Sequence, residues 1–213
     1  DLILEHLIHV KDDGSFWLDM QYFNYCHGLT MTSDKFHKLF GGPPRKPESL
    51  LTQREMDLAA SVQAVTEDVM LRLARYAQQE TGMRNLALAG GVALNCVGNG
   101  RILEQNLFDR IFIQPASGDA GGALGAAMFV WHQLLERPRN VRRPDAQNGS
   151  LLGPAFSDDE IGAFLQSVGA VYQTCETDTE LCESVAAMLS KEQVVGWFQG
   201  RMEFGPRALG ARS

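Results

Sequence analysis

One long stretch of the chain carries hydrophobic residues at the spacing of an amphipathic helix. Six of them follow one another at steps of 4, 3, 4, 4 and 3 residues, which places them on one face of a helix. Thr52 and Glu55 precede this stretch at the spacing of a capping box, and Gly82 follows it as a typical stop. The pattern therefore predicts a helix that begins near residue 52 and ends near residue 82. Its hydrophobic face consists of Leu58, Val62, Val65, Val69, Leu73 and Tyr76.

The residues before this helix follow other patterns. Phe16, Leu18 and Met20 alternate with other positions after the turn-forming residues 11–14, which predicts a strand that follows a hairpin turn. Residues 31–51 contain two glycines and two prolines in succession and a further proline, a composition that disfavours both helix and strand. We therefore expect a surface loop at residues 31–51.

Short hydrophobic runs alternate with helical segments after the long helix. We expect a strand at residues 86–89, a helix at 93–106, a strand at 110–114 and a helix at 119–136. This order is typical of a parallel α/β unit, in which each helix crosses from one strand to the next. The sequence therefore predicts an α/β fold class for this part of the chain.

Polar residues with prolines separate this unit from a second one, which is too short to be a comfortable domain alone. The elements expected in the second unit are helices at residues 157–168 and 179–190 and strands at 170–173 and 194–198. The predicted division is a first domain at residues 1–140, a linker at 141–152 and the start of a second domain at 153–213.

Composition narrows the classes of function. Hydrophobic residues make up 45% of the chain and charged residues 21%, which is ordinary for a packed protein and disfavours disorder. With 19 basic and 26 acidic residues the formal charge is −7, so the broad cationic surface of a nucleic-acid or membrane-surface binder is missing. No apolar run reaches the ~18 residues of a membrane span. Four scattered cysteines and the lack of a secretion signal favour the cytoplasm.

The first candidate site is the turn at Gly90 and Gly91, between the strand at 86–89 and the following helix. Glycines at such a turn let a ligand approach the backbone, and the amides at the start of the helix favour phosphate. Asn95 is expected in the first helical turn, where its amide could bind a ribose or a phosphate. A tight turn without any ligand is the alternative interpretation.

The second candidate site follows the strand at 110–114. Asp119 comes at the carboxyl end of this strand, where open α/β sheets bind ligands, and could coordinate a cation that holds phosphates. Capping of the next helix is the alternative role for this aspartate. Gly118, Gly121 and Gly122 surround it and indicate that a nucleotide or another helix approaches closely.

The third candidate site lies at the end of the sequence. Arg201, Arg207 and Arg212 are spaced 6 and 5 residues apart around a Gly-Pro turn, and together they could bind one phosphate dianion through bidentate hydrogen bonds. Glu203 could orient one guanidinium, and the hydroxyl of Ser213 could add a contact. The alternative is a set of surface arginines beside Glu203. Because the chain lacks an initial Met and stops directly after this motif, we expect it to be part of a longer protein.

Taken together, the motifs resemble those of the O-carbamoyltransferases of the nodulation-factor and antibiotic-biosynthesis type, including the tobramycin and cephamycin tailoring enzymes. The similar segments extend over nearly the whole chain. They are residues 22–23, 57–63, 89–96, 118–127 and 200–207.

The resemblance implies a particular pair of folds. The first domain would be half of an actin/hexokinase/chaperone-type ATPase domain, which is ribonuclease H-like. The second would be the beginning of an α/β domain that forms carbamoyl adenylate. The family's His-x-x-x-His metal ligands are absent from this chain, so Asp119 is the one metal-ligand position that it retains.

The resemblance also implies the chemistry. Carbamoyl phosphate and ATP would form a carbamoyl adenylate, and the carbamoyl group would pass to a hydroxyl of a small-molecule acceptor. Asp119 would hold a divalent metal, either Fe(II) or Mg²⁺. Catalytic roles would fall to Arg201, Glu203 and Arg207. The other implied contacts are carbamoyl phosphate or adenylate at Arg201, Arg207, Arg212 and Ser213, and the nucleotide at Gly90, Gly91, Asn95, Gly118, Gly121 and Gly122.

Two other functions remain open from the residues alone. The same fold could serve an actin-like ATPase or a sugar-kinase-type phosphotransferase, although the arginine-rich end of the chain argues against these. A nucleotide-binding module without catalysis is the second alternative, because the metal histidines are missing. The residues encode neither the acceptor nor the oligomeric state.

Overall fold

The computed structural model describes residues 1–141 and 146–211. The chain forms two compact units, one of residues 1–88 and 95–113 and the other of residues 89–94 and 114–213. Residues 142–145 of the predicted linker lie outside the described part of the chain, as do the predicted ligand residues Arg212 and Ser213. The proposed division into domains at residues 140 and 153 stays a prediction.

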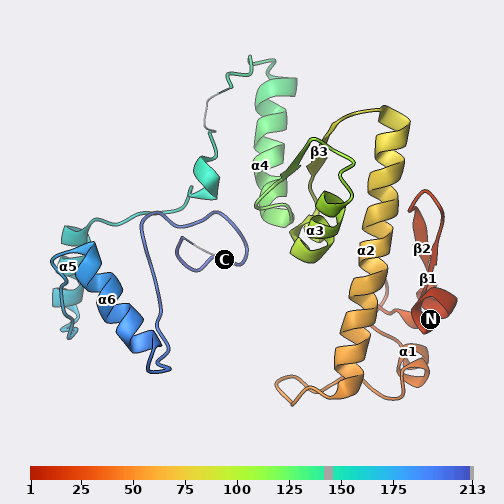
Figure 1. The fold of residues 1–213 in the computed structure, drawn as a ribbon, viewed down its shortest axis with the longest axis horizontal. Coiled ribbons are helices and arrows are strands. Elements are labelled where there is room, and N and C mark those ends of the chain that lie inside the picture. The colour runs from red at the N-terminus through yellow and green to blue at the C-terminus, as the bar shows by residue number, and fades with distance from the viewer. Residues whose placement is uncertain (142–145, 212–213) are drawn as a thin grey trace. The chain divides into compact units, whose positions relative to one another are not determined.

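The first unit begins with a π-helical turn at Ile3–Leu7 and a β-hairpin (Figure 1). Strands β1 (Ile8–Val10) and β2 (Phe16–Leu18) pair in antiparallel fashion, with Ile8 opposite Leu18. The turn between them is closed by Asp13, whose carboxylate accepts hydrogen bonds from the backbone and the hydroxyl of Ser15. The predicted hairpin is confirmed, but its second strand ends at Leu18, and Met20 instead begins a 3₁₀ turn at Met20–Tyr22.

The expectation of an irregular loop at residues 31–51 is wrong in one place. A short helix, α1 (Asp34–Leu39), lies within this segment, and Ser33 precedes it in extended backbone. The glycines and prolines that suggested a loop begin only at residue 41, beyond the helix, so they end α1 rather than prevent it.

Helix α2 (Gln53–Thr81) is the longest element and has the predicted ends. The carboxylate of Glu55 accepts hydrogen bonds from the backbone N–H and the hydroxyl of Thr52, at 2.9 and 2.5 Å. Gly82 ends the helix in the left-handed region at φ 62°, and its N–H donates to the carbonyl of Gln78. The capping box and the glycine stop therefore act as the sequence indicates.

The core of the first unit lies where α2 meets the N-terminal segment. Ile3, Leu7 and Ile8 pack with Val69 of α2 in one buried cluster, and Val65 lies against it. Only this part of the predicted hydrophobic face is covered, since three of its members expose about half of their surface. These are Val62 at 52%, Leu73 at 44% and Tyr76 at 44%.

The predicted parallel unit is confirmed. Strands β3 (Asn85–Leu88) and β4 (Arg110–Ile113) pair in parallel, and α3 (Cys96–Glu104) connects them. Helices α2 and α3 pack together, and Arg101 of α3 binds Glu67 of α2 at 3.0 Å. Helix α3 begins three residues later than expected because Asn95 caps it. The chain thus combines helix and parallel sheet, while the ATPase-type half-domain stays a prediction.

The second unit contains mainly helices in its described residues. A 3₁₀ turn forms Gly91–Leu94, α4 (Asp119–Phe129) continues into a π-helical turn at Val130–Leu134, and a second 3₁₀ turn lies at Asn148–Ser150. Helices α5 (Asp158–Ser167) and α6 (Asp178–Leu189) confirm the two predicted near the chain end. The strands expected at residues 170–173 and 194–198 are wrong, since both segments are coil.

No helix among the described residues is both long enough and apolar enough to cross a membrane.

Candidate functional site

The Gly90–Gly91 turn lies directly beside the start of α4. Gly90 has φ 100°, a conformation that residues with a side chain rarely adopt, and its N–H donates to the carbonyl of Ser117 at 2.7 Å. A Cβ on Gly118 would lie 4.0 Å from the Cα of Gly91. The structure therefore brings the first two predicted glycine motifs together.

Helix α4 starts without a capping side chain. Gly118 is its N-cap residue, so the amides of the first turn receive no hydrogen bond from a side chain at that position. Gly121 is required by packing, because a Cβ there would come 2.0 Å from the carbonyl oxygen of Ala116. Gly122, in contrast, faces open space. This arrangement leaves donors at the helix start for an anionic group.

Asp119 occupies the first turn of α4 and is exposed. Since consecutive Cα atoms are about 3.8 Å apart, its Cα lies within about 10 Å of that of Gly91. No three side chains of His, Cys, Asp or Glu gather into a possible metal site within residues 1–141 and 146–211. The described residues thus supply one carboxylate and do not form a complete metal site by themselves.

Asn95 has a structural role that the sequence reading did not anticipate. Its Oδ1 accepts a hydrogen bond from the amide of Gly98 at 3.0 Å and so caps α3. Its side chain also exchanges two hydrogen bonds with Gln63 of α2, at 2.8 and 3.2 Å. A contact of Asn95 with a ribose or phosphate stays a prediction, and such a contact would compete with Gln63.

Gln63 extends this network along α2. It donates to Glu67 at 2.9 Å, and Glu67 also binds Arg101. The hydrogen bond from Gln63, followed by that from Arg101, holds the pKa of Glu67 below its usual range. Gln63 was not among the predicted site residues. The sequence around it, including its spacing of six residues from Asp57, gives no indication that it pairs with Asn95.

The arginine-rich segment is only partly free to bind a ligand. Nη1 of Arg201 donates to the backbone carbonyl of Gly153 at 2.6 Å, so this arginine fastens two segments of the second unit. Arg207 is exposed, and its guanidinium forms no ion pair with the described residues. The backbone of Glu203 donates to the carbonyl of Gly210 at 2.9 Å, which closes the turn around Gly205 and Pro206.

Ser117 is a further candidate that the sequence reading missed. Only 5% of its surface is exposed, and its hydroxyl has no hydrogen-bond partner among the described residues. A buried polar group left in this way costs about 1–3 kcal/mol. Its place one residue before the N-cap of α4 marks the start of this helix as a polar site that its own side chains do not satisfy.

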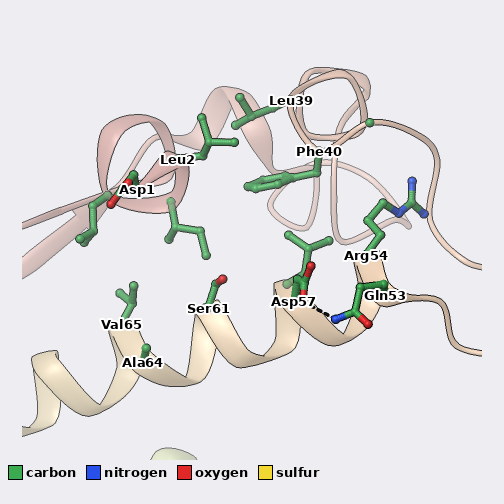
Figure 2. Close-up of a pocket in the computed structure, with 14 residues that line it drawn as sticks. Asp1, Leu2, Leu39, Phe40, Gln53, Arg54, Asp57, Ser61, Ala64 and Val65 are labelled. Carbon is green, nitrogen blue, oxygen red and sulfur yellow. Dashed lines mark hydrogen bonds between the residues drawn. The ribbon is translucent and has the colours of Figure 1, made fainter.

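A separate cavity lies in the first unit, over the N-terminal half of α2 (Figure 2). Its volume is about 840 Å³. Residues of α2 form its floor, and Leu2, Leu39 and Phe40 lie across from them. Asp57 and Ser61 of the floor belong to the segment 57–63 that carries part of the resemblance described above.

Two segments of the chain match known protein families. Residues 1–128 match the family described as the carbamoyltransferase N-terminus, and residues 186–213 match the carbamoyltransferase C-terminus. The first match contains the cavity over α2, the glycine turn and the start of α4. The second contains the arginine-rich segment.

Individual relatives agree with these matches. An uncharacterized protein of Synechocystis sp. is 60% identical over 215 residues, which cover 100% of this chain and 35% of that protein. The nodulation protein NolO of Bradyrhizobium diazoefficiens is 40% identical over 162 residues, covering 76% of this chain and 29% of NolO. The chain thus spans about a third of the length of these relatives. With one family match over more than half of its residues, the chain belongs to the carbamoyltransferase family.

Proposed function

We propose that a protein carrying this chain transfers a carbamoyl group from carbamoyl phosphate, by way of an ATP-derived carbamoyl adenylate, to a hydroxyl of a small-molecule acceptor. The observation that carries the proposal is the pair of carbamoyltransferase matches, one over residues 1–128 and one over residues 186–213. Because the chain spans about a third of its relatives, the proposal concerns a protein of their full length.

The glycine turn and the start of α4 are the proposed nucleotide site. Gly90 and Gly91 are exposed, and the first-turn amides of α4 have no capping side chain at Gly118. Amides and the partial positive charge at a helix start favour phosphate groups. Asp119 at the same turn is the proposed ligand of a divalent cation that accompanies the phosphates, with further ligands needed beyond the described residues.

The arginine-rich segment is the proposed site of carbamoyl phosphate or of the adenylate. Arg207 is exposed, so it can form a bidentate pair with a phosphate without giving up an ion pair to the described residues. Arg201 keeps one donor on Gly153 and has others for a ligand. Glu203 would orient a guanidinium or accept from the carbamoyl NH₂ group.

The proposed reaction has three steps. Water releases inorganic phosphate from carbamoyl phosphate and leaves carbamate. A carbamate oxygen attacks the α-phosphorus of ATP, and pyrophosphate departs to give the carbamoyl adenylate. The acceptor hydroxyl then attacks the carbamoyl carbon, loses its proton, and AMP departs. Arginine side chains favour the first two steps because they offset the negative charges that these steps bring together.

Arg207→Ala is the direct test, in a protein of the relatives' full length. We expect carbamoyl-phosphate-dependent pyrophosphate release from ATP to require roughly 10- to 100-fold more carbamoyl phosphate, since a charge-assisted pair contributes about 1.5–3 kcal/mol. Arg207→Lys should restore little of this, because an ammonium lacks the two-pronged geometry. Arg139→Ala, another exposed arginine of the second unit, is the matched control and should behave as the unchanged protein.

Two results would contradict the proposal. If the kinetics of pyrophosphate release are unchanged in Arg207→Ala, this arginine is an ordinary surface residue and does not bind the phosphate. ATP turnover that continues without carbamoyl phosphate, with transfer of a phosphoryl group to an acceptor, would instead favour a kinase-type activity.

A further inference from the structure

The cavity over α2 has an apolar wall that is held in place by the protein core. Leu39 and Phe40, at the end of α1, line the cavity and also pack against the cluster of Ile3, Leu7, Ile8 and Val69. Leu2 completes this wall and exposes 44% of its surface. Since the wall rests on buried residues, the cavity exists without a ligand to order it.

The opposite side of the cavity, formed by α2, combines polar side chains with the apolar Leu58, Ala64 and Val65. Asp57 and Ser61 are one helical turn apart on α2, and both extend toward the apolar wall in Figure 2. One oxygen of Asp57 accepts a hydrogen bond from Gln53 at 2.7 Å, and the other has no partner among the described residues. The floor therefore offers a carboxylate oxygen and a hydroxyl that face a hydrocarbon surface.

The charges around the cavity disfavour an anionic ligand. Asp57 accepts hydrogen bonds and repels anions, so hydroxyl groups suit it and a sulfonate or phosphate does not. Arg54 also lines the cavity, but its guanidinium already binds Glu55 at 2.7 Å and the carbonyl of Pro43 at 2.9 Å. A volume of about 840 Å³ falls within the range of small-molecule sites.

We propose that this cavity binds a small neutral amphiphile. The hydrocarbon part of the ligand packs on Leu2, Leu39 and Phe40, and its hydroxyl groups donate to Asp57 and Ser61. The identification of this ligand with the carbamoyl acceptor rests on the proposed function; the binding itself does not. The site gives Asp57 and Ser61 of segment 57–63 a role, since the proposed nucleotide and arginine sites use neither residue.

Binding of octyl β-glucoside to the 213-residue chain tests the site. Ligand-observed NMR titration, kept below micelle-forming concentrations, gives the dissociation constant, and octane-1-sulfonate serves as the anionic probe with the same hydrocarbon. We expect octyl glucoside to bind and the sulfonate to bind at least about tenfold more weakly. Asp57→Asn should weaken the binding of octyl glucoside by about 3- to 10-fold. It should also reduce the ratio by which the chain binds octyl glucoside more tightly than the sulfonate.

Two alanines of α2 give a matched pair of variants. Ala64 lines the cavity and Ala60, one turn earlier, does not; both are exposed, so leucine at either position leaves the helix intact. Ala64→Leu fills the cavity and should weaken the binding of octyl glucoside about tenfold or more, whereas Ala60→Leu should leave this binding unchanged. Equal binding by both variants, or equal binding of the two probes, overturns the proposal.

The acceptor role has its own measurement. In a protein of the relatives' full length, Ala64→Leu should raise the KM for octyl glucoside as a carbamoyl acceptor and leave carbamoyl-phosphate-dependent pyrophosphate release unchanged. If that release is absent in the unchanged protein, the proposed function fails while the binding result stands. If release occurs and the KM is the same in both alanine variants, the cavity is not the acceptor site.

Discussion

Helices α2 and α5 begin in the same way and differ in what surrounds them. Each starts with a capping box, Thr52 with Glu55 in α2 and Ser157 with Glu160 in α5. Helix α2 buries Val69 and Ala74, whereas none of the residues of α5 is buried. The comparison separates two contributions to a helix: the cap determines where it begins, and buried side chains determine how strongly it is held.

The largest expected effect comes from replacing an isoleucine by alanine, once in the packed first unit and once in α5. Ile102 of α3, in the same packed unit as α2, is 2% exposed, and Ile161 of α5 is 43% exposed. Ile102→Ala should lower the free energy of unfolding of the first unit by about 2–5 kcal/mol, because it leaves a cavity. Ile161→Ala should change stability by no more than about 0.5 kcal/mol. Residue-resolved hydrogen exchange measures both, and similar losses would show that α5 is packed as firmly as α3.

An intermediate effect is expected from the caps of α3 and α6. Asn95→Ala removes the cap of α3 and both hydrogen bonds with Gln63, and should cost about 1–2 kcal/mol by thermal or urea unfolding. Thr177→Ala removes the single bond from the amide of Glu180 to the Thr177 hydroxyl, and should cost about 1 kcal/mol or less.

Asn95→Asp separates the two roles of this residue. The aspartate keeps an acceptor for the amide of Gly98 and loses the donor to Gln63, so we expect a loss smaller than that of Asn95→Ala. If aspartate and alanine destabilise equally, the hydrogen bond that Asn95 Nδ2 donates to Gln63, rather than the cap, accounts for the effect.

The smallest effect concerns acid. The hydroxyl of Thr52, then Arg54 and the backbone of Thr52, lower the pKa of Glu55 to about 2. The stabilisation from its carboxylate is therefore fully present above the ordinary pKa near 4.5 and is lost as the pH falls through about 2. An NMR titration of the Thr52 amide should show this low midpoint, and Glu55→Gln should abolish the transition.

The Ser157 amide sharpens the comparison. The backbone and the hydroxyl of Ser157 lower the pKa of Glu160 as well. The NMR signal of the Ser157 amide should therefore also titrate below the usual range of a glutamate. A titration of the Thr52 amide near 4.5 would mean that the capping box of α2 does not persist in solution.

The parts of the structure that depend on neighbours in the chain could be predicted from the sequence. The ends of α2, the hairpin at β1 and β2, and the helices α5 and α6 all follow from caps, turns and periodicity within a few residues. The strands expected at residues 170–173 and 194–198 fail because a strand needs a partner, and no described segment pairs with either. Their hydrophobic pattern alone could not reveal this.

The candidate site shows the same limit. The positions of Gly90 and Asp119 between a strand and a helix could be predicted from the sequence. The parallel pairing of β3 with β4 brings such turns to one edge of a sheet. The pairing of Asn95 with Gln63, 32 residues apart, and the buried hydroxyl of Ser117 depend on packing. Neither has a local signature, and the link between Arg201 and Gly153, 48 residues apart, has none either.

The length of α2 gives it the property of a lever. Its 29 residues without a break extend over roughly 43 Å, at about 1.5 Å per residue. A rotation of about 5° around the end that carries Thr52 moves the end at Gly82 by roughly 4 Å, a displacement comparable to the spacing of two residues. If α2 tilted at the cavity floor, the displacement would therefore be larger at its other end, where the chain turns toward β3.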